Sequence, residues 1–209
     1  SGAGGIKIID FISDRASQRT NKGTGSQVGY YKGNLEQRND ALSYGEEFGT
    51  TGLIAGIIVN DIAMTVLPNA PIDADTGLPV PTIAVATPQG ISVIKDDGTV
   101  VDITHTNYTI SYQVKFLPSG GIAYTTDNSS NQRWLHVDHT LPSSDDTKGI
   151  GYSGASDDEM YHTVDGSTYT GQNMKFSLDK LNAGFIVTNE GNITVGSSLY
   201  GIGLIARNP

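Results

Sequence analysis

The chain has 209 residues, with 26 glycines, 8 prolines and no cysteine, and its 13 lysines and arginines against 22 aspartates and glutamates give a formal net charge of −9. Without cysteine, the protein has no disulfide, no thiolate metal site and no cysteine nucleophile. An acidic chain with few, scattered cations offers no basic surface for phosphates, so we expect no nucleic-acid partner.

The composition favours strands and turns over helices. Glycine, serine and threonine together make up nearly a third of the chain, and 37% of the residues are hydrophobic. This balance is too apolar for a disordered chain and too often interrupted by glycine for a helical bundle. The length therefore suits one large all-β domain or two small ones.

Residues 1–55 are predicted to form an N-terminal segment of one strand and a polar loop, able to complete a neighbouring sheet. Residues 6–12 are strand-like, and residues 34–48 are expected to form one short helix or a polar loop. Residues 52–59 form the longest apolar run, which we interpret as a buried strand. The run is far shorter than the ~20 residues that cross a bilayer, and we expect neither a signal peptide nor membrane insertion.

Residues 56–209 are predicted to form an antiparallel β domain with about three repeated units. Each unit has three short alternating strands separated by Gly, Pro, Asn or Asp turns. The units comprise residues 63–68, 82–87 and 91–94, with a fourth strand at 99–103; residues 113–118, 121–126 and 133–137; and residues 173–178, 184–189 and 192–195. The alternative is a chance alignment, since any antiparallel protein contains short alternating strands.

A meander of this kind carries apolar residues on both faces of its middle strand and must stack on its neighbours. The predicted fold class is therefore all-β, built from antiparallel meanders in a propeller-like or sandwich-like arrangement, with at most one short helix. Residues 96–98, Asp-Asp-Gly, are expected to form a plain hairpin turn, and Trp134 is expected to pack in the core.

Residues 78–102 resemble a β-propeller blade of the broad WD/kelch-like type, in particular blades of tail-associated and fibre-like bacteriophage proteins. Residues 116–124 followed by 133–138 show the same strand–turn–strand pattern. The resemblance covers residues 59–142, extends weakly to 173–203, and is absent from 1–55. It implies a non-enzymatic role on a virion surface or outside the cell, with loops presented to glycans or partner proteins.

The number of units bears on assembly. Closed propellers have ~4–8 blades, whereas this chain has three predicted units and an N-terminal segment able to complete a further one. Either the chain belongs to a longer polypeptide, or another copy completes its sheets. The apolar strands at residues 6–12 and 199–206 are available for strand addition, which predicts self-association into an oligomer or filament.

Several side chains are candidates for ligand chemistry. Asp73 and Asp75 alternate before a glycine, as at the start of a calcium loop, but the bidentate glutamate of such a loop is missing, and an ordinary turn is the alternative. No other cofactor is expected. On a strand, His136 and Asp138 fall on one face and His139 on the other, which disfavours a metal shared by the two histidines. A glycosidase would use acids such as Asp145, Asp157 and Glu159.

Two further groups of residues are candidates for surface contacts. N-glycosylation sequons occur at Asn107, Asn128 and Asn192. Tyrosines in polar stretches are candidates for stacking on sugars or for partner contacts, or alternatively for half-buried strand positions: Tyr30, Tyr31, Tyr152, Tyr161 and Tyr169.

The sequence thus favours a non-catalytic structural protein of an extracellular or virion-surface fibre or tail-like appendage, assembled through β-strand contacts. The alternative is a lectin-like adhesion module that binds carbohydrate.

Overall fold

The computed structural model describes residues 4–13, 15–20, 28–32, 44–45, 52–106, 110–127, 133–148, 159–162, 185–188, 193–197 and 201–205. These residues form strands and turns in four sheets and contain no helix. The predicted all-β fold class is confirmed. The same residues accordingly include no helix long and apolar enough to cross a membrane.

The N-terminal sheet has four antiparallel strands in the order β1-β2-β3-β4. They are β1 (Ile6–Asp10), β2 (Arg15–Arg19), β3 (Val28–Lys32) and β4 (Tyr44–Gly45). Three of these strands fall where the sequence predicted a polar loop or a short helix. Their residues are largely polar, and β2 gains its stability from pairing on both edges rather than from an apolar pattern of its own.

The second sheet has the strand order β12-β8-β7-β6-β5. It contains β5 (Asp61–Thr65), β6 (Thr82–Thr87), β7 (Gly90–Ile94), β8 (Val100–His105) and β12 (Asp146–Lys148). The first four strands form an antiparallel meander, whereas β12 pairs with β8 in parallel. The predicted antiparallel meander is therefore present in β5–β8, and β12 adds a parallel pairing at the edge of the sheet.

The third sheet has the order β13-β11-β10-β9, and the fourth has the order β14-β15-β16. The third contains β9 (Ile110–Phe116), β10 (Ile122–Asp127), β11 (Arg133–Asp138) and β13 (Glu159–His162). The fourth contains β14 (Phe185–Val187), β15 (Ile193–Ser197) and β16 (Gly201–Ile205). All pairings within these two sheets are antiparallel.

The strands of the first two predicted units lie within a few residues of β5–β8 and β9–β11. The turn at Asp97 and Gly98 is confirmed, because Gly98 N donates to Lys95 O and Lys95 N donates to Thr99 O. In the third unit, residues 173–178 lie outside the described residues, and the other two strands correspond to β14 and β15.

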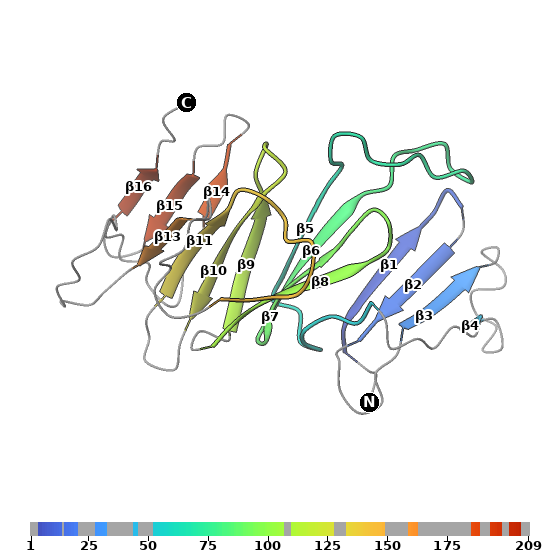
Figure 1. Ribbon diagram of the computed structural model, residues 1–209, viewed down its shortest axis with the longest axis horizontal. Helices are drawn as coiled ribbons and strands as arrows, with labels where there is room; N and C mark the ends of the chain where they lie inside the picture. Colours follow the sequence, from blue (N-terminus) through green and yellow to red (C-terminus); the bar gives the residue numbers. More distant parts are fainter. Residues whose placement is uncertain are drawn as a thin grey trace.

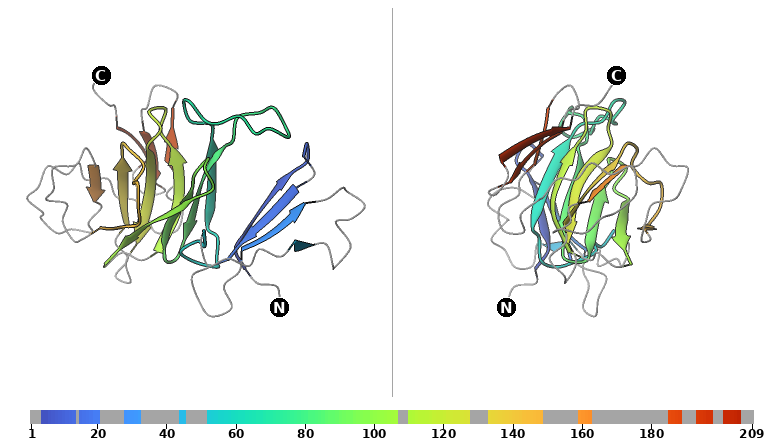
Figure 2. Two further views of the ribbon diagram at one scale, coloured as in Figure 1. Left: turned by 45° about the vertical axis from the view of Figure 1, so that its right-hand side comes forward. Right: turned by 90° about the vertical axis from the view of Figure 1, so that its left-hand side faces the viewer.

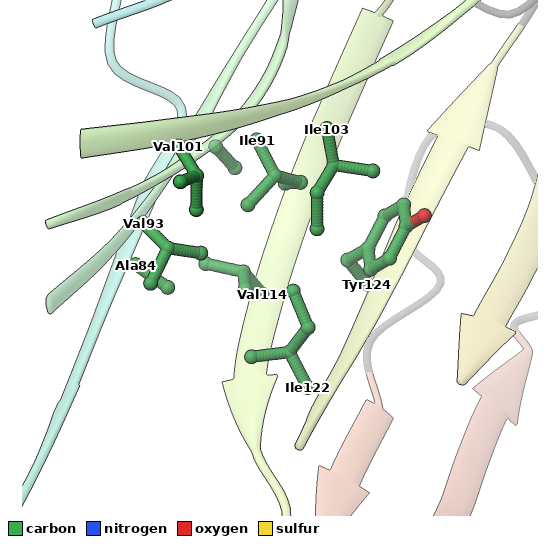
Figure 3. Close-up of a cluster of buried hydrophobic side chains, with 9 residues drawn as sticks. Ala84, Ile91, Val93, Val101, Ile103, Val114, Ile122 and Tyr124 are labelled. Carbon is green, nitrogen blue, oxygen red and sulfur yellow. The ribbon is translucent and has the colours of Figure 1, made fainter. Parts of the chain in front are cut away.

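The four sheets follow one another in chain order across the molecule, as Figures 1 and 2 show. Three clusters of buried apolar side chains fill the spaces between successive sheets. The cluster between the second and third sheets is drawn in Figure 3, where β6, β7 and β8 contribute side chains from one side and Val114, Ile122 and Tyr124 from the other.

Both faces of the second sheet are buried along its centre. Every residue of β6 and β7 is buried. Ala84 and Val93 pack toward the third sheet, whereas Ile83 and Val85 pack with Ile6 of the N-terminal sheet. Because successive side chains of a strand point to opposite faces, a strand that is apolar throughout requires a partner sheet on each side. The stacking of units expected from the sequence follows from this requirement.

The apolar run at residues 52–59 is not a strand, and its prediction as a buried strand is wrong. Leu53 and Ile54 are buried, but Ile57 and Ile58 are exposed. Gly52 adopts a φ of 83°, a left-handed conformation that interrupts an extended chain. The segment is a loop that inserts Ile54 between the N-terminal and second sheets.

We expect Ile91→Ala, in the centre of the cluster between the second and third sheets, to lower the free energy of unfolding by about 2–5 kcal/mol, because Ile91 is fully buried. Urea denaturation monitored by Trp134 fluorescence measures the change. The matched control is Ile72→Ala at an exposed loop position, with an expected effect within about 0.5 kcal/mol. Equal effects of the two variants would contradict the stacked core.

Candidate functional site

A group of polar side chains lies between the second and third sheets, beside the apolar cluster of Figure 3. We call it the polar cluster; its members are His105, Tyr124, Thr126, His136, Asp138 and Lys148. Strands β8 and β12 supply His105 and Lys148, which face each other in the parallel register. Strands β10 and β11 supply the other four, and Tyr124 stands opposite His136 in the antiparallel register.

Aromatic stacking and hydrogen bonds connect the cluster. The rings of Tyr124 and His136 are stacked with their centroids 4.9 Å apart, and the rings of His105 and His136 are 4.5 Å apart. His105 Nε2 lies 3.2 Å from the Tyr124 hydroxyl, which donates to Asp138 Oδ2 at 3.5 Å. A further hydrogen bond of 2.8 Å joins Thr126 Oγ1 and His136 Nε2.

Lys148 brings the positive charge of the cluster. Its Nζ lies 2.9 Å from Asp146 Oδ2 and 3.5 Å from Asp138 Oδ2. The Lys148 side chain is 10% exposed and that of Asp138 is 1% exposed, so the pair is shielded from solvent. A buried carboxylate is tolerated when a cation and hydrogen bonds compensate its lost hydration, as Lys148 and Tyr124 do here.

Both histidines are neutral near pH 7. The pKa of His105 is lowered to about 4, mainly by burial and also by the nearby Lys148, while Asp146 opposes the change. Burial, followed by the nearby His105 and Lys148, holds the pKa of His136 well below its usual range. Neutral rings stack and share hydrogen bonds without mutual repulsion, which the observed geometry requires.

The polar cluster has the residue types of a proton-transfer site, but His105, Tyr124, His136 and Asp138 are each 5% exposed or less. A group that catalyses must come within hydrogen-bond reach of its substrate. In the folded chain these groups contact one another, and their directional bonds connect the third sheet to the second.

A second polar contact region joins the N-terminal sheet to loops that flank the second sheet, through two arginines of β2. Arg15 and Arg19 lie at the two ends of the strand, four residues apart and thus on one face. Arg19 is buried and donates from Nη1 to Gly52 O at 2.7 Å. A side chain at position 52 would collide with the Arg19 guanidinium, so the glycine admits this contact as well as the left-handed turn.

Arg15 reaches the loop between β5 and β6, which Figure 2 shows extending toward the N-terminal sheet. Its guanidinium lies 2.7 Å from Asp73 Oδ2, 3.3 Å from Asp75 Oδ2 and 3.8 Å from Asp10 Oδ2. The hydrogen bond from Arg15 lowers the pKa of Asp73, assisted by the backbone amides of Thr76 and Asp75. These amides donate to Asp73 Oδ1 and form a tight aspartate turn.

In this geometry Asp73 forms an aspartate turn, and both carboxylates lie beside Arg15. The calcium-loop interpretation of Asp73 and Asp75 stays a prediction. The cation beside both carboxylates is a guanidinium of the same chain. Within the described residues, no three His, Asp or Glu side chains gather closely enough to hold a metal ion. His136 and Asp138 do share one face of β11, as predicted, and both belong to the polar cluster.

The structure describes part of the other predicted sites. Tyr30 and Tyr31 lie in β3 and Tyr161 in β13, where the backbone but not the side chain is described. Tyr152, Tyr169, Asn107, Asn128 and Asn192 lie outside the described residues. Of the acids named for a glycosidase, Asp145 Oδ1 accepts a hydrogen bond from Asp102 N, Glu159 begins β13, and Asp157 lies outside the described residues. Trp134 is buried, as predicted.

The sequence interpretation missed His105, Tyr124 and Lys148, as well as Arg15 and Arg19. For the arginines the local sequence carried no signal of a strand, and positions 15 and 19 share a face only once β2 is known to be extended. For the polar cluster the signal was weak, since its members come from four strands whose order in space the sequence does not reveal.

Comparisons with protein-family models, with curated proteins and with solved structures found no match to this chain. The resemblance of residues 59–142 to propeller blades of phage tail and fibre proteins therefore stays a prediction.

We expect the protein to lose stability as the pH falls from 6.5 toward about 4. In this window the unfolded chain binds protons at its histidines while His105 and His136 stay neutral in the fold. Depressed pKa values in the folded state give stability that is complete above pH 6.5 and is lost on acidification; for His105 alone the loss is about 3 kcal/mol.

Urea denaturation at pH 7.5, 6, 5 and 4.5 measures this loss. In His136→Gln, which keeps a hydrogen-bonding side chain beside Thr126 but does not titrate, the dependence on pH should become shallower below pH 6.5 and remain that of the native chain above pH 7. An unchanged slope in the variant would show that other groups cause the acid sensitivity.

We expect Arg15→Gln to release the 66–81 loop from β2, because Asp73 and Asp75 lose their cation. Hydrogen exchange of the Asp75 and Thr76 amides should accelerate, and the pKa of Asp73 should rise toward its ordinary value of 3.8. NMR measures both effects. Lys95→Gln, in the β7–β8 turn, is the control and should leave the loop unchanged. Exchange that is unaltered in Arg15→Gln would mean that the loop is held by other contacts.

Proposed function

We propose that this chain is a non-catalytic structural protein of an extracellular or virion-surface fibre or tail-like appendage, which assembles through contacts between β-strands. The observation that carries the proposal is the position of the first and last described strands. Within the described residues, β1 pairs with β2 alone and β16 pairs with β15 alone, so each lies at the edge of its sheet.

An edge strand presents a row of backbone amide and carbonyl groups to a partner chain. In β1, the side chain of Ile9 is exposed, and Phe11 and Ile12 follow it in an exposed turn. Strand addition at such an edge adds backbone hydrogen bonds and buries alternate side chains. Edges at both ends of the described chain support assembly in which each copy continues the next.

The stacked arrangement also supports a structural role. Each pair of successive sheets shares its own apolar cluster, so the fold is extended by repeating one kind of contact. The polar residues that resemble catalytic groups are buried between sheets and contribute to this stacking. The extracellular or virion-surface location rests on the blade-like character of residues 78–102 and is part of the proposal.

Light scattering after size exclusion, together with negative-stain electron microscopy, tests the proposal over a range of protein concentrations. The native chain should form oligomers or filaments. Ile9→Lys in β1 should reduce assembly because a charge on an edge strand opposes strand addition, whereas Ile72→Lys in the exposed loop should not. A monomer at high concentration contradicts the proposal, and a monomer that binds glycans on an array would support the lectin-like alternative.

A further inference from the structure

The apolar face of the second sheet continues beyond the part that the N-terminal sheet covers. In the antiparallel register of β5 and β6, Ile62 stands beside Val85 and Met64 beside Ile83. Val85 and Ile83 are buried against the N-terminal sheet. Ile62 and Met64 point to the same face, yet they are 46% and 68% exposed.

The strand that carries these side chains is also a sheet edge. Within the described residues, β5 pairs with β6 alone. Val66, which continues the alternation just after the strand, is exposed as well. An exposed edge with a row of large apolar side chains is unusual in a monomer, because it invites pairing with another chain.

The edge strand of the third sheet next to β5 is β9, and its backbone groups are hydrogen-bonded to side chains. The backbone of β9 is covered by side chains that precede or begin β5: Asn60 Nδ2 donates to Ser111 O at 2.7 Å, and Asp61 Oδ2 accepts from Val114 N at 3.1 Å. Lys115 of β9 adds an ion pair with Asp61 at 2.8 Å. Charged residues and covered backbone groups are the usual protection of an edge against pairing. Within the described residues, Asn60 and Asp61 cover the edge of β9, whereas β5 has β6 as its one strand partner.

The residue pattern of β5 is complementary to itself. If two copies pair antiparallel about Ala63, Ile62 of each lies opposite Met64 of the other, and Asp61 lies opposite Thr65. Apolar side chains then meet on one face, and the other face has no like-charge pair. A symmetric contact of this kind closes with two-fold symmetry.

We infer that β5 is a dimerisation edge, at which two copies of this chain pair their β5 strands antiparallel about Ala63 and join their second sheets into one continuous sheet. The occupant is a second copy because β5 matches itself in register and because the exposed row continues the sheet-on-sheet interface already formed with the N-terminal sheet. This inference rests on the proposed structural function and specifies one of the strand contacts through which copies of the chain assemble.

Single-cysteine variants test the register directly, because the native chain contains no cysteine. Directly opposed residues in antiparallel strands have Cα atoms about 4.5–5.5 Å apart, within the range that a disulfide spans. Ala63→Cys should therefore form a reducible covalent dimer under mild oxidation. Thr99→Cys, in the exposed β7–β8 turn, is the matched control and should stay monomeric on a non-reducing gel.

Met64→Lys provides a second, independent test. Because Met64 is exposed in the single chain, the variant should keep the native circular dichroism and melting temperature. It should weaken dimerisation by about tenfold or more in analytical ultracentrifugation, since it buries a charge against Ile62 of the other copy. Ile72→Lys, which adds the same charge in the exposed loop, should dimerise like the native chain.

The outcomes separate this inference from the proposed function. Covalent dimers of Ala63→Cys together with weakened association of Met64→Lys support the β5 contact. A native chain that assembles while both β5 variants behave like their controls overturns the β5 contact and leaves the structural function standing. A native chain that is monomeric at every concentration overturns both.

Discussion

Strands β6 and β7 are buried on both faces, and the rest of the structure depends on covering those two faces at once. Burial of apolar surface contributes roughly 25 cal/mol per Å², so an uncovered face of this sheet would leave the fold without much of its driving force. The chain meets the requirement by placing the N-terminal sheet on one side and the third sheet on the other. The third sheet repeats the solution, because its far face packs against Phe185 and Ile193 of the fourth sheet.

Apolar stacking is non-directional and leaves the lateral position of one sheet on another poorly defined. Directional polar contacts fix the lateral position of the neighbouring sheets at both interfaces of the second sheet. Arg15 and Arg19 fix the N-terminal sheet at two points four residues apart on β2. The polar cluster fixes the third sheet through His105 and Lys148 on one side and Asp138 on the other. In a chain without disulfides, such buried polar contacts are the specific ties between layers.

The edges of the sheets connect this architecture to function. A stack of small sheets has many edge strands, and in this chain they differ in whether side chains cover their backbone groups. The edge of β9 is covered by Asn60 and Asp61, whereas β1, β5 and β16 each have one strand partner within the described residues. Assembly through the edges of β1, β5 and β16, together with the protected edge of β9, would give the proposed structural function its physical basis.

The sequence by itself determined the fold class and the position of many strands. Alternating side chains and turn residues such as Asp97 and Gly98 act over a few neighbours, so β6, β7, β10 and β11 are recognisable locally. The same local rules placed His136 and Asp138 on one face. They failed at residues 52–59, where apolar composition suggested a strand but the left-handed Gly52 and exposed Ile57 belong to a loop, and in β2, whose polar residues give no strand pattern.

Only the tertiary structure decided which strands lie side by side and which faces are covered. The parallel pairing of β12 with β8, the meeting of His105 with His136, and the pairing of Arg15 with Asp73 all join residues distant in the chain. Nothing in the local pattern favours these partners, because their contacts depend on the order and offset of whole sheets. The exposure of Met64 also depends on how the sheets are placed. Met64 lies on the same face of the second sheet as the buried Ile83, but the N-terminal sheet does not extend far enough to cover it.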